Sequence, residues 1–209
     1  MKRLLLIGAT GLVGREVLRL ALADKRVSRV IAPTRRALPP DPKLENPLPD
    51  FHDLPVSAPW WQVDAVICTL GTTIKKAGSR DEFRRIDHDL PLAFAKLARE
   101  NGAEAFALNS SLGADPDSRS FYLRTKGEAE RDLAELDFSS LTFVRPSVIG
   151  GNRDESRPGE RVAAFLLGAL RPLIPARYRV VPATRIAGAL LESTLAGAPG
   201  TRTIESEAI

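Results

Sequence analysis

With 209 residues, of which 44% are hydrophobic and 27% charged, the chain has the length and composition of one globular domain rather than two. No apolar stretch reaches the roughly twenty residues that span a bilayer, and a glycine turn stands where a signal peptide would have its cleavage region. The net charge of +4 comes from scattered arginines rather than a dense basic block or an aromatic-interleaved stripe, so nucleic acid is the least favoured partner.

The first predicted element is a strand that runs into a glycine-rich turn. Residues 4–7 are large and apolar, as in a buried parallel strand, and from Val13 onward apolar residues recur at helical spacing. Gly8, Gly11 and Gly14 allow, in that order, a sharp turn, close approach of a pyrophosphate, and packing of the helix on the strand. Backbone N–H groups at a helix start bind anions without a charged side chain. We therefore expect a dinucleotide site, with a ligand-free turn as the alternative; its residues are Gly8, Thr10, Gly11, Leu12 and Val13.

A second short strand, 27–32, ends just before two arginines. In NAD-binding units of this type an acidic residue at this place bonds the ribose, whereas an arginine accommodates the 2′-phosphate of NADP. No carboxylate occurs between Val27 and Leu38, and Arg35 and Arg36 stand where the acid would be. These arginines favour NADP(H) over NAD(H); a solvated basic turn is the alternative.

Prolines crowd residues 37–59, which predicts a loop with a short third strand near 48–51. Trp60 and Trp61 then close this segment, and neighbouring tryptophans favour packing over a stacking platform. A fourth strand, 63–70, leads into glycine and hydroxyl residues at the carboxyl edge of the sheet, where α/β proteins bind ligands. The cofactor residues expected there are Leu70, Gly71 and Thr72.

Cys68, the single cysteine, lies within this strand and cannot form an internal disulfide. It suits a reducing compartment, and we expect a cytoplasmic protein without a membrane segment.

The second half continues the alternation of helices and strands. A helical pattern runs from Ser79 to Ala98, with a kink or break at Pro91. His88 in this pattern and His52 in the preceding loop have no partner at metal-ligand spacing, so no metal site is expected. Strands at 103–109 and 141–144 flank a helix that ends near residue 136. This alternation of strands and helices predicts an α/β fold with a doubly wound parallel sheet, known as a Rossmann fold, in a single domain 1–209.

Tyr122 and Lys126 stand four residues apart, so on a helix they share one face. A tyrosine hydroxyl titrates near 10, and a neighbouring ammonium favours the phenolate. A serine hydroxyl at the end of the preceding strand, from Ser111 or Ser110, could hold a substrate oxygen while the tyrosine moves the proton. Of the two serines, Ser111 is favoured for this role by its position in the chain.

The order of these motifs resembles the short-chain dehydrogenase/reductase superfamily in its atypical NAD(P)-binding, epimerase-like branch. The resemblance rests on GATGLVG (8–14), LGTT (70–73), SSLGA (110–114), the Tyr122/Lys126 pair and Arg145-Pro146. LGTTIKKAGS, SSLGAD and ESRPGE are most similar to the HIV Tat-interacting protein-like oxidoreductases. The resemblance implies a carbonyl-polarising Ser111, a general acid/base Tyr122, a Lys126 that binds the nicotinamide ribose and lowers the tyrosine's pKa, and a nicotinamide border at Pro146 and Val148.

Residues 151–209 are expected to form a small substrate-covering region within the domain. A charged loop at 152–160 precedes an apolar helix at 162–170, whose alternatives are a substrate pocket, plain packing or a homodimer contact. A short strand at 180–182, a helix at 185–196 and an edge strand at 202–205 follow. The region is small, which argues against a bulky sugar-nucleotide substrate.

The sequence is compatible with two functions. The first is an NADP(H)-dependent oxidoreductase that transfers hydride to or from a small carbonyl or alcohol substrate. The second is an NADP(H)-sensing binding protein that regulates a partner without turnover. A complete serine–tyrosine–lysine set favours the first, because a sensor has no need of it.

Overall fold

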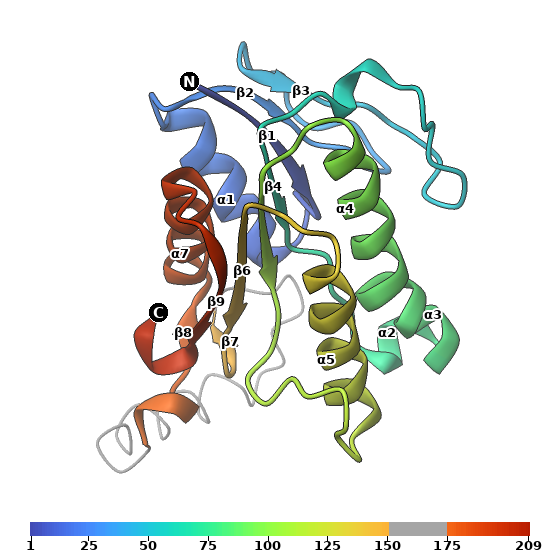
Figure 1. Cartoon of the computed structure of the whole chain (residues 1–209), viewed down its shortest axis with the longest axis vertical. Coiled ribbons are helices and arrows are strands. Elements are labelled where there is room, and N and C mark those ends of the chain that lie inside the picture. Colours follow the sequence, from blue (N-terminus) through green and yellow to red (C-terminus); the bar gives the residue numbers. More distant parts are fainter. Residues whose placement is uncertain (151–174) are drawn as a thin grey trace.

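Seven parallel strands form the central sheet of the computed structural model, which describes residues 1–150 and 175–209. Their order is β3-β2-β1-β4-β5-β6-β9, so the doubly wound α/β prediction is confirmed (Figure 1). The strands are β1 (Lys2–Ile7), β2 (Val27–Ile31), β3 (Leu44–Glu45), β4 (Ala65–Cys68), β5 (Ala105–Asn109), β6 (Ser140–Arg145) and β9 (Gly200–Glu205). The chain reverses its direction of crossover between β1 and β4, and ligands bind at such a switch point in open α/β sheets.

Helices cover both faces of the sheet. On one face α1 (Leu12–Ala23) packs against α7 (Ala183–Ala196); α4 (Leu90–Glu100) and α5 (Phe121–Ala134) lie on the other (Figure 1). Alternate residues of β1 enter the two cores: Leu4 and Leu6 face α1 and α7, while Leu5 and Ile7 face α4. Both faces are buried, which is why β1 reads as one apolar run.

The smaller elements lie around this frame. A separate parallel pair joins β7 (Ile149–Gly150) to β8 (Val181–Pro182). Two short helices precede α4, α2 (Ile74–Ala77) and α3 (Arg80–Arg84), and 3-10 turns occupy Pro59–Trp61, Ala176–Tyr178 and Ser206–Ala208.

The third strand lies earlier than the prolines suggested. It is Leu44–Glu45, where Val30 and Ala32 donate to the carbonyls of Lys43 and Glu45 at 2.9 Å each, and residues 48–51 form a loop. The prediction of a strand there was wrong because Pro47 precedes that segment and Pro49 lies within it, and neither has the N–H donor that a strand ladder needs.

The predicted break near Pro91 is present, but it takes the form of a π-helical turn. Arg85–Asp89 makes this turn between α3 and α4, and Pro91 then lies in the first turn of α4. A proline interrupts the hydrogen-bond ladder of the preceding turn, and the extra residue of a π turn absorbs the mismatch.

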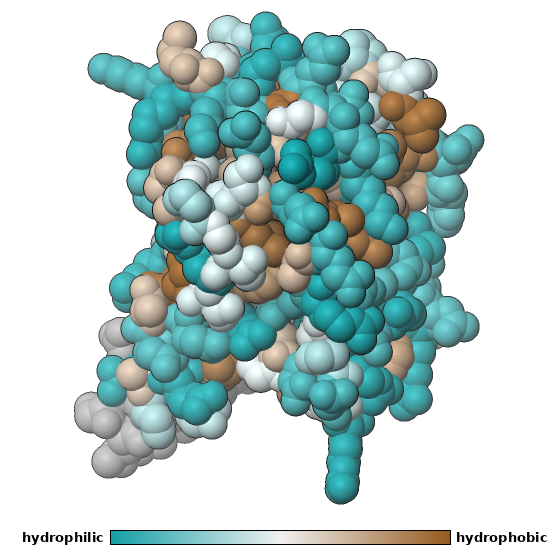
Figure 2. Space-filling view, in the orientation of Figure 1, coloured by the Kyte–Doolittle hydropathy of each residue, from teal (hydrophilic) through white to brown (hydrophobic). Residues whose placement is uncertain are grey.

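The two tryptophans pack, as predicted. Trp61 is fully buried and donates from Nε1 to the carbonyl of Pro55 at 2.8 Å, and its ring centroid lies 4.0 Å from that of Trp60. Figure 2 shows a mostly hydrophilic face on which apolar residues appear only in small areas. Among the helices of residues 1–150 and 175–209, none is long and apolar enough to cross a membrane.

Part of the predicted C-terminal region, residues 175–209, lies within the described residues. The predicted helix and edge strand correspond to α7 and β9, which complete the central layers, and the strand near 180–182 corresponds to β8. The apolar helix expected at 162–170 and the charged loop at 152–160 lie outside the described residues. A substrate-covering role for 151–209 therefore stays a prediction.

Candidate functional site

The glycine turn after β1 is fixed by close packing. Gly8 has φ +86°, and its carbonyl accepts a hydrogen bond from Gly11 N–H at 2.9 Å. A Cβ on Gly14 would lie 2.0 Å from that carbonyl oxygen, and a Cβ on Gly8 would lie 2.8 Å from Leu70 N. Any larger residue at Gly8 or Gly14 would push the turn off the end of β4.

The start of α1 has the properties of an anion site. Gly11 is the N-cap, no side chain caps the helix, and its first turn holds no acidic residue. Thr10 and Gly11 are exposed, whereas Val13 is buried and can offer only its backbone amide. A pyrophosphate could therefore accept hydrogen bonds from free N–H groups with the helix dipole behind them, so the residues present fit a dinucleotide.

The two arginines after β2 face the same cavity as the glycine turn. Thr10, Arg35 and Arg36 line a cavity of about 540 Å³, and no carboxylate of residues 1–150 or 175–209 lines it. The loop that carries the arginines is held by Asn46, whose Nδ2 donates to Ala32 O at 2.6 Å and to Thr34 Oγ1 at 2.8 Å. Asn46 follows β3 by one residue, and nothing in the sequence pattern marks it.

The loop after β4 lies against the catalytic candidates. A Cβ on Gly71 would lie 3.6 Å from Asp87 Oδ1 and 3.8 Å from Lys126 Nζ. Thr72 N–H donates to Asp87 Oδ2 at 2.9 Å. Gly71 and Thr72 therefore border both the sheet edge and the buried charges of α5 and the π turn.

The two adjacent serines differ in their surroundings. Ser110 is 5% exposed and its hydroxyl donates to Glu130, which also holds the guanidinium of Arg145 through Nε at 3.0 Å. Ser111 is half-buried, and its hydroxyl makes no hydrogen bond to any residue within 1–150 or 175–209. This difference favours Ser111 as the hydroxyl that is free for a substrate.

Tyr122 and Lys126 lie one turn apart on α5, as their spacing predicts. Tyr122 is half-buried, and its ring centroid lies 5.6 Å from that of Phe83. Lys126 is 4% exposed, and its Nζ forms an ion pair with Asp87 Oδ1 at 2.7 Å. Burial disfavours the ammonium, but the charges of Asp87 and Tyr122 outweigh it and raise the pKa of Lys126 above its ordinary value.

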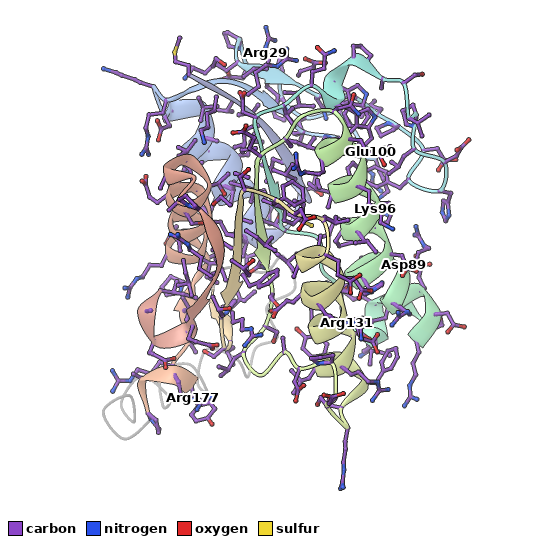
Figure 3. All side chains as sticks on the ribbon, in the orientation of Figure 1. Arg29, Asp89, Lys96, Glu100, Arg131 and Arg177 are labelled. Carbon is purple, nitrogen blue, oxygen red and sulfur yellow. The ribbon has the colours of Figure 1, made fainter. Side chains whose placement is uncertain are left out.

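Asp87 is the residue of this cluster that the sequence did not reveal. It stands in a run of charged residues, 84–89, that resembles a solvated helix face. Its neighbour Asp89 does point outward, as do Lys96 and Glu100 farther along α4 (Figure 3), but Asp87 is 1% exposed. The π turn rotates it inward, and a helical pattern with 3.6 residues per turn does not anticipate that rotation.

The residues after β6 border the same edge. Leu112 N–H donates to Pro146 O at 2.9 Å, so the serine loop and the loop after β6 are joined. Val148 is 60% exposed, which leaves an apolar surface beside the sheet edge. The resemblance to the short-chain dehydrogenase/reductase superfamily predicts that Pro146 and Val148 border the nicotinamide.

The histidines are not arranged as metal ligands. His88 Nδ1 lies 2.7 Å from Asp89 Oδ1, and its Nε2 lies 2.8 Å from Asp132 Oδ2. In the described ranges no group of three His, Cys, Asp or Glu side chains could hold a metal ion.

Two named proteins are similar to this chain over most of its length. No family profile matches the sequence. The chain is 37% identical over 204 residues to Protein HTATIP2 of Rattus norvegicus, covering 95% of this chain and 84% of that protein. It is 38% identical over 182 residues to the mitochondrial protein fmp52 of Emericella nidulans, covering 81% and 76% of the two chains.

Solved structures share the fold at low sequence identity. MoeE5 in complex with UDP-glucose and NAD superimposes with a TM-score of 0.72 at 17% identity, over 97% of this chain and 76% of that one. UDP-N-acetylglucosamine 4-epimerase from Bacillus cereus gives 0.69 at 17% identity, over 98% and 79%. At such identities the likeness establishes the Rossmann-type fold.

Proposed function

The chain belongs to the HTATIP2/FMP52 family of NAD(P)-binding proteins with the short-chain dehydrogenase/reductase fold, and on that premise we propose that it is an NADP(H)-dependent oxidoreductase. The reaction is hydride transfer to or from a small carbonyl or alcohol substrate. The observation that carries the proposal is a buried, charged Lys126 one helical turn from a half-buried Tyr122, beside the glycine turn of a dinucleotide fold. Perturbed ionisable groups of this type cluster at functional sites.

NADP(H) is preferred over NAD(H) in this proposal. The support is the cavity of Thr10, Arg35 and Arg36, where the described part of the chain offers two guanidinium groups and no carboxylate to an adenosine 2′-phosphate. The MoeE5 structure contains NAD and not NADP. The proposed preference for NADP(H) therefore rests on this chain's own arginines. The remaining cofactor contacts would come from Gly8, Gly11, Leu12, Val13, Leu70, Gly71, Thr72, Lys126, Pro146 and Val148.

The protein's own groups would handle the proton and the substrate oxygen. A bound nicotinamide supplies or accepts the hydride. Ser111 donates a hydrogen bond to the carbonyl oxygen, and Tyr122 gives that oxygen a proton in reduction or removes it in oxidation. Lys126 holds a ribose hydroxyl with its ammonium group, one helical turn from Tyr122.

The compartment and assembly belong to the same proposal. Cys68 is buried and free, which suits a reducing compartment such as the cytoplasm, although the fungal relatives are named mitochondrial. A homodimer contact through the apolar segment 162–170 also stays a prediction.

The test is a fluorescence titration with NADPH and NADH side by side, on wild type, Arg35→Ala and a control, Arg29→Ala. Arg29 is an exposed arginine of β2 outside the cavity (Figure 3). We expect Arg35→Ala to weaken NADPH binding by roughly tenfold, in line with the loss of a charge-assisted hydrogen bond, and to leave NADH unchanged. Equal affinities of wild type for the two cofactors would contradict the arginine argument, and binding of neither would contradict the whole proposal.

A further inference from the structure

One buried carboxylate joins two parts of the candidate site. Asp87 is 1% exposed and uses both oxygens: Oδ1 lies 2.7 Å from Lys126 Nζ, and Oδ2 accepts from Thr72 N–H at 2.9 Å. Lys126 comes from α5, Thr72 from the loop after β4, and Asp87 from the π turn before α4. Three separate elements therefore meet at one side chain.

The charges around Lys126 leave Asp87 as its counterion. Tyr122 faces it from the same helix, and Cys68 faces it from β4. Burial raises the pKa of the Cys68 thiol to about 12, so it is neutral at physiological pH. Glu130, one turn farther along α5, is engaged by Arg145 and Ser110. Among the described residues, Asp87 forms the ion pair that compensates the lysine.

We propose that Asp87 is a positioning residue: it keeps the buried Lys126 charged and ties that lysine to the cofactor-facing loop at Thr72. The part that concerns the cofactor rests on the proposed function. A lysine without a counterion in this environment would give up its proton or push the site open, because an unpaired buried charge is strongly unfavourable. The shared carboxylate makes lysine and loop one rigid unit.

The π turn offers a matched control for this role. His88, the next residue, contacts Asp132 of α5 through Nε2 at 2.8 Å. Asp132→Asn therefore alters a second carboxylate contact between the same turn and the same helix, but it leaves Lys126 and its ion pair in place. An effect of Asp87→Asn that Asp132→Asn does not reproduce comes from the counterion and not from the turn.

The first experiment is a thermal-unfolding cycle on the protein alone, with wild type, Asp87→Asn, Lys126→Met and the double variant. Breaking a buried ion pair from one side should lower the Tm by on the order of 10 °C, whereas removing both partners leaves no unpaired charge. We expect the double variant to regain more than half of the loss seen in Asp87→Asn. If Asp87→Asn does not fold, a folded double variant is the expected rescue. If the Tm losses of the two single variants simply add in the double variant, or if the double variant does not fold, the proposal is overturned.

The pH dependence of the Tm separates charge from shape. In Asp87→Asn the buried, unpaired lysine has a folded-state pKa below its unfolded value, so the unfolded state binds more protons and stability rises with pH. We expect the gap to wild type to narrow between about pH 7 and 9.5, while the gap for Asp132→Asn stays constant. A constant gap for Asp87→Asn would overturn the counterion role.

An NADPH titration tests the coupling to the cofactor loop. Asp87→Asn should bind NADPH roughly tenfold more weakly, and Asp132→Asn should bind as wild type does. An unchanged affinity in Asp87→Asn would overturn the coupling. If wild type itself does not bind NADPH, the proposed function fails, but the unfolding cycle needs no cofactor and still decides whether Asp87 is the counterion.

Discussion

The nucleotide side of the candidate site, around the glycine turn and Arg35, lies at the surface, whereas the side that carries Lys126 and Asp87 is buried. On the nucleotide side the binding groups are exposed backbone amides and guanidinium groups that meet around one cavity. On the buried side each charged group is held by another, from a different element.

This difference predicts different behaviour. Exposed charges interact through water and are screened by salt, while buried pairs are screened far less but are costly to break. Salt should therefore act mainly on the nucleotide side, whereas changes on the buried side should affect proton transfer and stability as well as affinity. Three predictions test that separation.

The largest expected effect is on turnover in Tyr122→Phe. Removing the hydroxyl should lower kcat by at least ~100-fold, because a positioned acid/base is typically worth that much. The affinity for NADPH should change little, since the ring and its packing on Phe83 are kept. Steady-state kinetics on any carbonyl substrate found by screening, with a parallel NADPH titration, would check this. Unaltered turnover would exclude Tyr122 as the acid/base and leave the sensor function as the better account of a protein that binds NADPH.

The next effect is on binding and stability in Gly14→Ala. The added Cβ would lie 2.0 Å from Gly8 O and 2.7 Å from Thr69 Oγ1, so the backbone of the turn must move. We expect a Tm lower by about 5 °C or more and NADPH binding at least about tenfold weaker. Calorimetry and titration measure both.

Gly188→Ala is the matched control for that variant. Gly188 lies within α7, and a Cβ there would meet nothing within 4 Å. Alanine should stabilise the protein by about 0.5–1 kcal/mol, because glycine is the poorer helix former. If both glycine variants behaved alike, the close approach at Gly14 would not be the cause.

The smallest effect is that of salt on cofactor preference. Raising NaCl from about 0.05 to 0.5 M shortens the screening length severalfold, so NADPH should lose affinity a few-fold more than NADH. In the proposed complex the extra 2′-phosphate would face Arg35 and Arg36, which are exposed and therefore screened by salt. A salt-independent NADPH/NADH ratio would show that the discrimination does not come from Arg35 and Arg36.

The nucleotide side was also the more predictable of the two from sequence. Each of its parts directly follows a strand: the glycine turn follows β1, and Arg35 comes shortly after β2. Because both strands are parallel, these segments come to the same edge of the sheet. The placement of Tyr122 and Lys126 one turn apart was also predictable, because helical periodicity places residues four apart on one face. The alternation of apolar runs and helices predicted the doubly wound parallel sheet, but not the order of its strands.

The contacts that were missed depend on distant partners. Asp87 faces inward only because a π turn precedes α4, and Ser110 is engaged only because Glu130, twenty residues later, reaches back to it. The third strand lies at Leu44–Glu45 and not at 48–51, because the available backbone hydrogen bonds, and not the apolar residues, determine where it pairs with β2. Asn46 supports the arginine loop across β2 and β3 without belonging to any pattern.

The packing of α1 against α7 has a consequence for synthesis. Val13, Val17 and Ala21 of the first helix share one core with Ile186 and Leu190, which are made long after α1. A ribosome translates residues 24–182 before that partner emerges, so the part of the apolar stripe of α1 that packs on α7 stays uncovered during this time. Such a late closing contact makes the growing polypeptide a natural client for chaperones, and release of folded protein should track completion of α7.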